Sequence, residues 1–361
     1  MERKLKVGIL GGTGMVGQRF ITLLANHPWF DVVSLAASER SAGKTYFEAV
    51  GDRWNMATPI PDAVGKIVVQ NVMEIDRICD QVDMVFCAVD MNKDEIKELE
   101  DSYAKAETPV VSNNGAHRFT PDVPMVIPEI NPEHMAIIDQ QRVRLGTKRG
   151  FVAVKPNCSI QSYVPPIHAL REFGPTRISV CTYQAISGAG KTFRDWPEMI
   201  DNVIPFIKGE DEKSEVEPLK IWGKIENGAI VKATEPVISA QCIRVPATDG
   251  HLAAVSVEFA RKPGKQEILD RWAAFKGRPQ QLNLPMAPVQ FLKYFEEENR
   301  PQTNLDRDYD KGMGITIGRL REDALFDYKF VALSHNTVRG AAGGGVLSAE
   351  LLVAEGYITA K

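Results

Sequence analysis

Short apolar runs alternate with segments of helical periodicity through the first 130 residues. We predict strands at 5–10, 31–37, 82–89 and 109–112, and helices at 15–26 and 92–106. Such an alternation is typical of a parallel sheet covered by crossover helices. The expected fold class is therefore α/β, beginning with a Rossmann-like parallel-sheet domain.

After residue 150 the pattern changes to strands that alternate between apolar and polar positions. Segments 178–183 and 252–260 alternate in this way, which favours a more antiparallel sheet with one solvated face. A long connection, rich in charge, is expected at 202–224. A second domain of the α+β type is the prediction for this half of the chain.

Length and composition agree with two globular domains. The chain has 361 residues, is 44% hydrophobic and 25% charged, and carries a net charge of −4. This charge gives no reason to bind nucleic acid or an anionic membrane, and no stretch approaches the length of a membrane span. The chain runs from its first residues directly into a strand without a signal-peptide pattern, and its five cysteines show no paired or metal-binding spacing. A cytoplasmic protein is expected.

A glycine-rich turn, 11–17, stands between the first predicted strand and the first predicted helix. Its G-x-x-G-x-x-G spacing allows a tight turn and exposes backbone amides at the helix start, where a pyrophosphate can bind. The end of the second strand favours NADP, because Ser38, Arg40 and Ser41 can bind a 2′-phosphate. Glu39 leaves the NAD alternative open.

The last stretch, 336–346, is dense in small residues and leads into an apolar helix predicted at 347–354. Small residues allow close backbone packing, so we expect this tail to return to the first domain and pack beside the cofactor. The predicted division is a cofactor domain of residues 1–155 plus 337–361 and a catalytic and dimerisation domain of residues 156–336.

Cys158 has a setting that differs from that of the other cysteines. Most free cysteines are small buried hydrophobes, and the other four fit that description. Cys158 follows a predicted strand, 151–154, and a helix predicted at 160–173 carries the thiol near its first turn, where the helix dipole lowers a thiol pKa. About ninety residues later, Arg244 and His251 offer a guanidinium for a carboxylate and an imidazole for proton transfer. Together they predict aldehyde oxidation through a thioester.

These residues resemble the aspartate-β-semialdehyde dehydrogenase family, and the sequences of the motifs resemble those of the branch found in archaea and fungi. The resemblance runs nearly end to end, through segments 11–17, 38–43, 112–118, 128–134, 156–159, 184–190, 209–213, 244–251 and 336–345. It implies that Cys158 attacks the aldehyde, that hydride passes to the nicotinamide, and that inorganic phosphate releases the resulting thioester. His251 would be the general acid–base and Gln184 would orient the substrate or the thiol.

The resemblance also implies the ligands. Arg244 would clamp the substrate α-carboxylate and Glu210 would meet its ammonium group. Arg118 and Lys213 would bind phosphate, with Asn114 nearby. The implied cofactor contacts are Gly11, Thr13, Gly14, Met15, Val16, Gly17, Ser38, Arg40, Ser41, Ala88, Ser187, Gly188, Gly190 and Asn336. The implied partners are aspartate semialdehyde and phosphate, with no metal, in a homodimer or homotetramer that serves lysine, threonine and methionine biosynthesis.

Two alternatives remain open at the level of the sequence. Acyl-CoA reductases acting on malonyl- or succinyl-CoA resemble this family, but the pair Glu210 and Lys213 and the segment 156–158 favour an amino-acid substrate. An NADP-binding regulatory or scaffold protein with a decayed site is the other alternative. Against it, none of the candidate catalytic positions is substituted.

Overall fold

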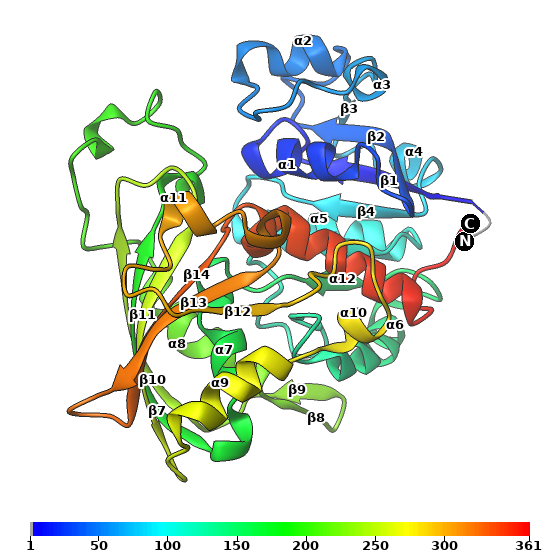
Figure 1. Cartoon of the computed structure of the whole chain (residues 1–361). Coiled ribbons are helices and arrows are strands. Elements are labelled where there is room, and N and C mark those ends of the chain that lie inside the picture. The colour runs from blue at the N-terminus through cyan, green and yellow to red at the C-terminus, as the bar shows by residue number, and fades with distance from the viewer. Residues whose placement is uncertain (1–2) are drawn as a thin grey trace.

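A computed structural model describes residues 3–361, and its first sheet confirms the predicted Rossmann-like parallel sheet. Six parallel strands lie in the order β3-β2-β1-β4-β5-β6 (Figure 1). Their bounds are β1 Leu5–Leu10, β2 Phe30–Ala37, β3 Gln70–Asn71, β4 Met84–Cys87, β5 Val110–Ser112 and β6 Val152–Val154. The predicted α/β class is therefore correct.

Helices cover both faces of this sheet. On one face, α1 (Met15–Leu24) and the C-terminal helix α12 (Gly343–Ala354) share a core that includes Phe20 and Leu347. On the other face, α4 (Ile75–Cys79) and α5 (Lys93–Lys105) pack their apolar residues against the strands. The remaining helices are α2 Tyr46–Val50, α3 Asp62–Gly65, α6 Ile138–Leu145, α7 Val164–His168, α8 Glu210–Ile221, α9 Lys265–Ala274, α10 Arg278–Gln281 and α11 Thr303–Asp306.

The glycine turn allows α1 to approach β1 closely. Gly11 has a φ of +85°, and a Cβ at this position would lie 2.3 Å from the carbonyl oxygen of Ala88. At Gly17, a Cβ would lie 2.3 Å from the carbonyl oxygen of Gly11. Both neighbours are backbone atoms that cannot rotate away, so only glycine fits these two positions.

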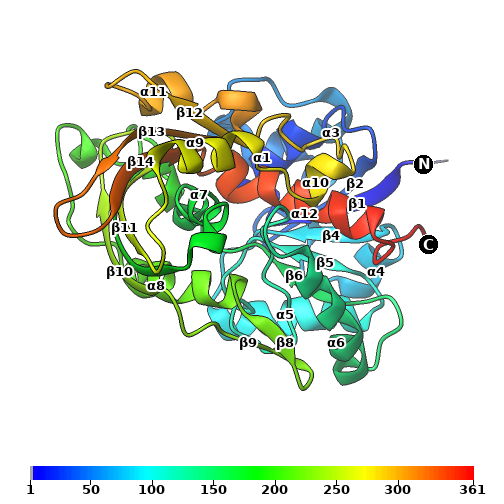
Figure 2. The ribbon, with the colours of Figure 1, turned by 60° about the horizontal axis from the view of Figure 1, so that its bottom comes forward.

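The second sheet is mixed but mainly antiparallel, as its alternating pattern predicts. Its order is β10-β7-β11-β14-β13-β12, and only the two outer pairings, β10 with β7 and β13 with β12, are parallel. Helices α7 and α9 contribute to the core on its inner face (Figure 2). The strands of this half are β7 Pro175–Gln184, β8 Lys224–Glu226, β9 Ala229–Val231, β10 Val237–Arg244, β11 His251–Phe259, β12 Leu292–Phe295, β13 Ile315–Glu322 and β14 Tyr328–Ser334.

Two predicted segments are wrong. The continuous helix predicted at 160–173 is broken into a 3-10 turn at Ser159–Gln161, the short α7 and another 3-10 turn at Arg171–Phe173. Pro165 and Pro166 lack the amide protons that a continuous helix would need there. The charged connection predicted at 202–224 contains α8 (Glu210–Ile221), whose acidic first turn matches the positive end of the helix dipole.

A proline inside α8 fixes that helix beside the cysteine segment. Pro218 cannot donate a hydrogen bond to the carbonyl of Ser214, one turn earlier. The freed carbonyl accepts a hydrogen bond of 2.6 Å from the hydroxyl of Tyr163, a fully buried residue five positions after Cys158. The carbonyl that the interior proline leaves unpaired is thereby satisfied, and α8 is anchored against the segment that carries the thiol.

The tail returns to the first sheet as predicted. After β14 it forms a π-helical turn at Val338–Ala342 and continues into α12 (Figure 1). Within the turn, the buried guanidinium of Arg339 donates to both carboxylate oxygens of Glu129, from the loop that precedes α6. It also donates to Gln161 at 3.3 Å and stacks on the ring of Phe291.

We predict that Glu129→Gln lowers the stability of the protein by about 3–5 kcal/mol, because it leaves Arg339 as an uncompensated buried charge. Urea unfolding followed by circular dichroism measures the change. The matched control is Glu322→Gln, which breaks an exposed pair with Lys262 and should leave the midpoint nearly unchanged. An equal loss of unfolding free energy in the two variants would contradict the larger contribution predicted for the buried pair.

Candidate active site

Two strands of the second sheet end, and a neighbouring strand begins, at one place. Gln184, the last residue of β7, pairs with Arg244 at the end of β10 and with His251 at the start of β11. This register places Gln184 beside two side chains that lie 60 and 67 residues later in the sequence. The predicted Gln184, Arg244 and His251 are therefore assembled by strand pairing alone.

Cys158 lines a cavity of about 380 Å³ in front of these strand ends, which we call the catalytic cavity. The segment after β6 carries the thiol into it, and the tail closes its rim: a Cβ on Gly340 would lie 2.8 Å from the Cβ of Cys158. The other predicted residues on its wall are Val16, Arg118, Ser187, Gly188, Glu210, Lys213 and Asn336.

The expectation that a helix start lowers the pKa of Cys158 is wrong. Only a one-turn 3-10 helix follows the thiol, so the helix dipole there is small. Burial raises the pKa of Cys158, and the nearby Glu210 carboxylate raises it further. Lys155, Arg118 and Arg244 act in the opposite direction without overcoming these effects.

Glu210 and Lys213 face each other one turn apart at the start of α8. Lys213 donates to one carboxylate oxygen of Glu210 at 3.0 Å. Asn157 and Gln184 donate to the other oxygen at 2.8 Å and 3.2 Å. Burial favours a higher pKa for Glu210, but these partners outweigh it and lower the pKa. A carboxylate therefore stands on the cavity wall beside the thiol.

His251 lies beneath the catalytic cavity, not on its wall. It is fully buried, and a Cβ on Gly188 would lie 3.0 Å from its Nε2 atom. Its Nδ1 accepts a hydrogen bond of 3.1 Å from the amide of Ala185, so the neutral ring carries its proton on Nε2. Burial and the Arg244 guanidinium lower the pKa of His251 to about 3.

Arg244 is buried without a carboxylate partner among residues 3–361. Its Nη1 donates to the carbonyl of Ala185 at 2.6 Å. A buried guanidinium normally pairs with an acid. The other donors of the planar Arg244 guanidinium are free for a carboxylate ligand.

The two predicted phosphate residues of the first domain behave differently. Arg118 lines the cavity but already donates to Glu217 at 2.9 Å and to two backbone carbonyls. The side chain of Asn114 does not reach the wall, because its amide donates to Cys87 and Glu100. Its neighbour Asn113 lines the cavity instead, and neither polar atom of the Asn113 side chain has a partner.

A second cavity of about 540 Å³ follows the carboxyl ends of β1, β2 and β4, and we call it the cofactor cavity. The predicted contacts on its wall are Gly11, Thr13, Gly14, Ser38, Arg40 and Ala88. Ser41 is buried beside an adjoining hollow that Arg40 and Arg53 share with the cofactor cavity. Met15 and Gly17 lie in the first turn of α1, and Gly190 is exposed outside both cavities.

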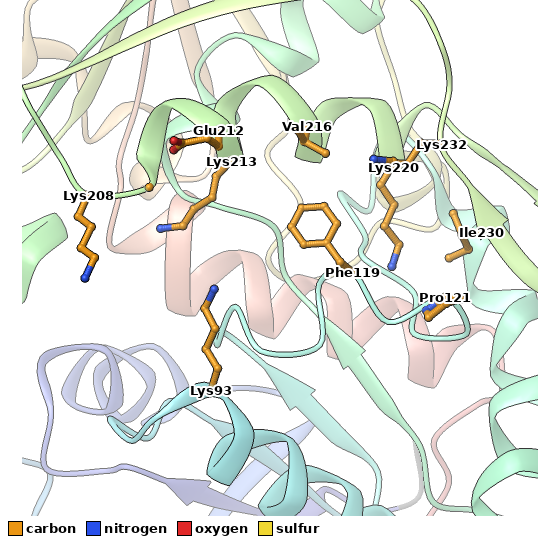
Figure 3. Close-up of a pocket in the computed structure, with 11 residues that line it drawn as sticks. Lys93, Phe119, Pro121, Lys208, Glu212, Lys213, Val216, Lys220, Ile230 and Lys232 are labelled. Carbon is orange, nitrogen blue, oxygen red and sulfur yellow. The ribbon is translucent and has the colours of Figure 1, made fainter.

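A third cavity, of about 850 Å³, adjoins the catalytic cavity, with which it shares Lys93, Phe119 and Lys213. Figure 3 shows the side chains of Lys93, Lys208 and Lys213 pointing into the same open space. Lys220, at its far end, is held by three backbone carbonyls. The approach to the catalytic cavity is therefore positively charged.

Sequence reasoning missed Lys155, Asn113, Arg53 and Lys93, all of which line one of these cavities. Lys155 lies inside the motif that carries Cys158, but nothing in the sequence signals that its ammonium group is buried. Within residues 3–361, no cluster of three or more metal-ligating side chains is found, and no helix is long and apolar enough to cross a membrane.

Comparisons with known proteins agree with this geometry. Residues 6–138 match the family model of the semialdehyde dehydrogenase NAD-binding domain, and residues 165–339 match that of the semialdehyde dehydrogenase dimerisation domain. Aspartate-semialdehyde dehydrogenases of Archaeoglobus fulgidus and Aspergillus fumigatus are 43% and 42% identical, each over 98% of this chain and at least 99% of the relative.

Solved structures agree as well. The NADP complex of the Candida albicans aspartate-semialdehyde dehydrogenase has a TM-score of 0.88 at 38% identity, covering 99% of this chain and all of that one. A Vibrio cholerae homologue has a TM-score of 0.75 at 25% identity, covering 98% of this chain and all of that one. The resemblance in the motifs is therefore confirmed, and the chain belongs to the aspartate-semialdehyde dehydrogenase family.

Proposed function

We propose that the protein catalyses the NADP-dependent, phosphate-dependent interconversion of L-aspartate 4-semialdehyde and L-4-aspartyl phosphate. The observation that carries the proposal is a thiol and an acid–lysine pair on the wall of one cavity, with an unpaired arginine directly behind that wall at Gly188. An amino acid with a reactive side chain needs these three features: a nucleophile, an acid for its ammonium group and a cation for its carboxylate.

The substrate would lie with its ends on opposite charges. Arg244 would bind the α-carboxylate through its free donors, and Glu210 would accept from the α-ammonium. The aldehyde carbon would then face Cys158, whose sulfur adds to it. The Nε2–H of His251, which has no partner, would donate to the oxygen atom that gains negative charge in this addition.

Phosphate would enter from the lysine-lined cavity. Lys213 lies at the junction of that cavity with the catalytic cavity, and its side chain is about one third exposed. Arg118 would contribute less charge than its sequence motif suggests, because Glu217 neutralises it. Asn113, rather than Asn114, is the amide that would complete the phosphate site.

The cofactor cavity fits NADP. The close approach at Gly11 and Gly17 would leave the backbone of the turn open to a pyrophosphate, and Arg40 and Arg53, which line both the cofactor cavity and the adjoining hollow, would bind the 2′-phosphate. NADP bound there would accept hydride from the substrate carbon. Val16 on the catalytic cavity and Gly14 on the cofactor cavity belong to the same turn, which supports one continuous site.

We propose the domain division and assembly as well. Residues 1–155 plus 337–361 would form the cofactor domain, because α12 packs with α1. Residues 156–336 would form the catalytic and dimerisation domain. On the connection between β7 and α8, the apolar side chains of Ile200, Val203 and Phe206 are exposed. Exposed apolar side chains of this size favour a homodimer contact.

The first prediction concerns the nucleophile. Cys158→Ala should abolish turnover of aspartate semialdehyde with phosphate and NADP, followed by absorbance of the reduced cofactor, while NADP binding by calorimetry stays intact. Cys181→Ala, which removes another partly exposed thiol, is the control and should remain active. If the protein reduced malonyl-CoA with NADPH but did not oxidise aspartate semialdehyde, the proposed substrate would be wrong and an acyl-CoA would take its place.

The second prediction separates the two anion sites. Arg244→Lys should raise the KM for the semialdehyde, because an ammonium cannot reproduce a planar two-pronged contact. Lys213→Ala should instead raise the KM for phosphate roughly 10- to 150-fold, which corresponds to the loss of one charge-assisted contact of about 1.5–3 kcal/mol. The opposite pattern of KM changes would mean that the two sites are assigned the wrong way round.

The third prediction concerns the choice of cofactor. Arg40→Ala and Arg53→Ala should each raise the KM for NADP about tenfold, the effect of losing one exposed charge-assisted contact with a phosphate. The KM for NAD, which lacks that phosphate, should change little and serves as the internal control. A parallel rise for both cofactors would place these arginines outside the 2′-phosphate site.

A further inference from the structure

Glu217 is a fully buried acid on the wall of the catalytic cavity, and it was not predicted from the sequence. It lies on α8 two turns after Glu210, so the two side chains leave the same face of the helix and line the cavity together with Cys158. Burial of a carboxylate is costly unless its oxygens are hydrogen-bonded. The partners of Glu217 therefore indicate what this acid does in the site.

One oxygen of Glu217 holds Arg118. Nη1 of Arg118 donates to Oε1 at 2.9 Å. The other two nitrogens of the guanidinium, Nε and Nη2, donate to the carbonyls of Lys155 and Asn113 at 3.1 Å and 3.3 Å. Every nitrogen of the guanidinium thus has a protein partner, and its plane is fixed. Because a guanidinium has five N–H bonds, donors remain for a ligand in the cavity that Arg118 lines.

The other oxygen of Glu217 holds the residue before the nucleophile. The backbone amide of Asn157 donates to Oε2 at 2.6 Å, and the side-chain amide of Asn157 donates to Glu210 at 2.8 Å. The side-chain oxygen of Asn157 accepts from the backbone amide of Ser159 at 2.7 Å. The backbone on both sides of Cys158 is thereby tied to α8 through Asn157.

We propose that Glu217 is a positioning residue that sets the distance between bound phosphate and the acyl group on Cys158. The assignment rests on the proposed function. In the phosphate step, a phosphate oxygen bonds to the thioester carbon, the C–S bond breaks, and its electron pair leaves with the sulfur of Cys158. Arg118 would support the phosphate and Asn157 supports the thiol segment, and one carboxylate contacts both supports. A misplacement of about 1 Å between reacting groups can cost roughly 100-fold in rate.

Positioning and charge neutralisation by Glu217 have opposite consequences. The carboxylate also neutralises Arg118. If neutralisation were its main effect, removing the negative charge would strengthen the attraction for phosphate and speed the phosphate step. If Glu217 positions Arg118, removing the charge would free the guanidinium from its fixed plane and slow that step.

The test is Glu217→Gln, with kcat/KM measured separately for phosphate and for aspartate semialdehyde. Gln has the shape of Glu but one acceptor oxygen in place of two, so its NH2 group would face a donor. The value for phosphate should fall at least about tenfold, while the value for the semialdehyde, which reports thioester formation, should change by less than about threefold. A merely structural role would lower both values equally, because it lowers the amount of active protein.

Glu215→Gln is the matched control. It removes a carboxylate from the same helix, outside the residues that line the three cavities. The oxygen that remains can still accept from the amide of Ala240, which donates to Glu215 at 3.0 Å. Both kcat/KM values should stay near those of the wild type.

A double-mutant cycle tests whether Glu217 acts through Arg118. In an Arg118→Gln background, adding Glu217→Gln should lower kcat/KM for phosphate by less than about twofold, because the group that Glu217 positions is already gone. A rise in kcat/KM for phosphate in the single variant, an equal fall for both substrates, or full additivity in the cycle would overturn the assignment.

If Glu217→Gln does not fold, Glu217→Asp replaces it. Asp keeps the charge but is one methylene too short to reach both partners, so the same selective fall is expected. A wild-type protein that does not oxidise aspartate semialdehyde with phosphate would reject the proposed function and this assignment with it. An active wild type whose variants show no selective fall would reject the role of Glu217 alone.

Discussion

The buried ion pair of Arg339 and Glu129 is the interaction on which the arrangement of the site depends. It joins the tail to the loop before α6, and the same guanidinium reaches Gln161, just after Cys158, and the ring of Phe291. A charge this deeply buried is stable only with its partner in place, so the tail has one docked position. Gly340, the next residue, then meets Cys158. The position of the thiol is therefore set by residues almost two hundred positions later in the chain.

The charges of the site follow from how the acids are distributed. Glu217 neutralises Arg118, and Glu210 neutralises Lys213, which leaves Arg244 as a buried cation and Lys155 as a buried amine, with its pKa lowered to about 7, without carboxylate partners in the described chain. Burial of unpaired positive charge is costly, and an anionic ligand or a thiolate relieves that cost. The free site is thus prepared for an anion at Arg244. The lysine-lined approach adds an attraction of the same sign over a longer range.

Much of the fold and about half of the site could be predicted from the sequence, for a physical reason. Apolar runs indicate buried strands, and closely spaced glycines indicate a close approach of backbones. For this reason β1, the turn at Gly11 and the tail could be predicted. The break in the helix predicted at 160–173 also has a local signal, because Pro165 and Pro166 have no amide proton to donate. Side-chain direction and long-range burial have no such local signal. Asn113 lines the cavity in place of Asn114 because the Asn114 side chain is held by Glu100, and Lys155 is buried beside Arg118. Both arrangements depend on residues that only the folded chain brings together.

The tail also links the cofactor to the thiol. The π-helical turn at Val338–Ala342 packs against α1, the helix that begins at the glycine turn, while Thr337 and Gly340 form part of the catalytic wall. One segment therefore contacts both α1, which follows the glycine turn, and the cavity wall around the nucleophile. Because hydride transfer requires reacting atoms to be held a few ångströms apart, this shared contact is a better candidate for setting that distance than either domain alone. Packing in the tail thus belongs to the chemistry as well as to the stability of the fold.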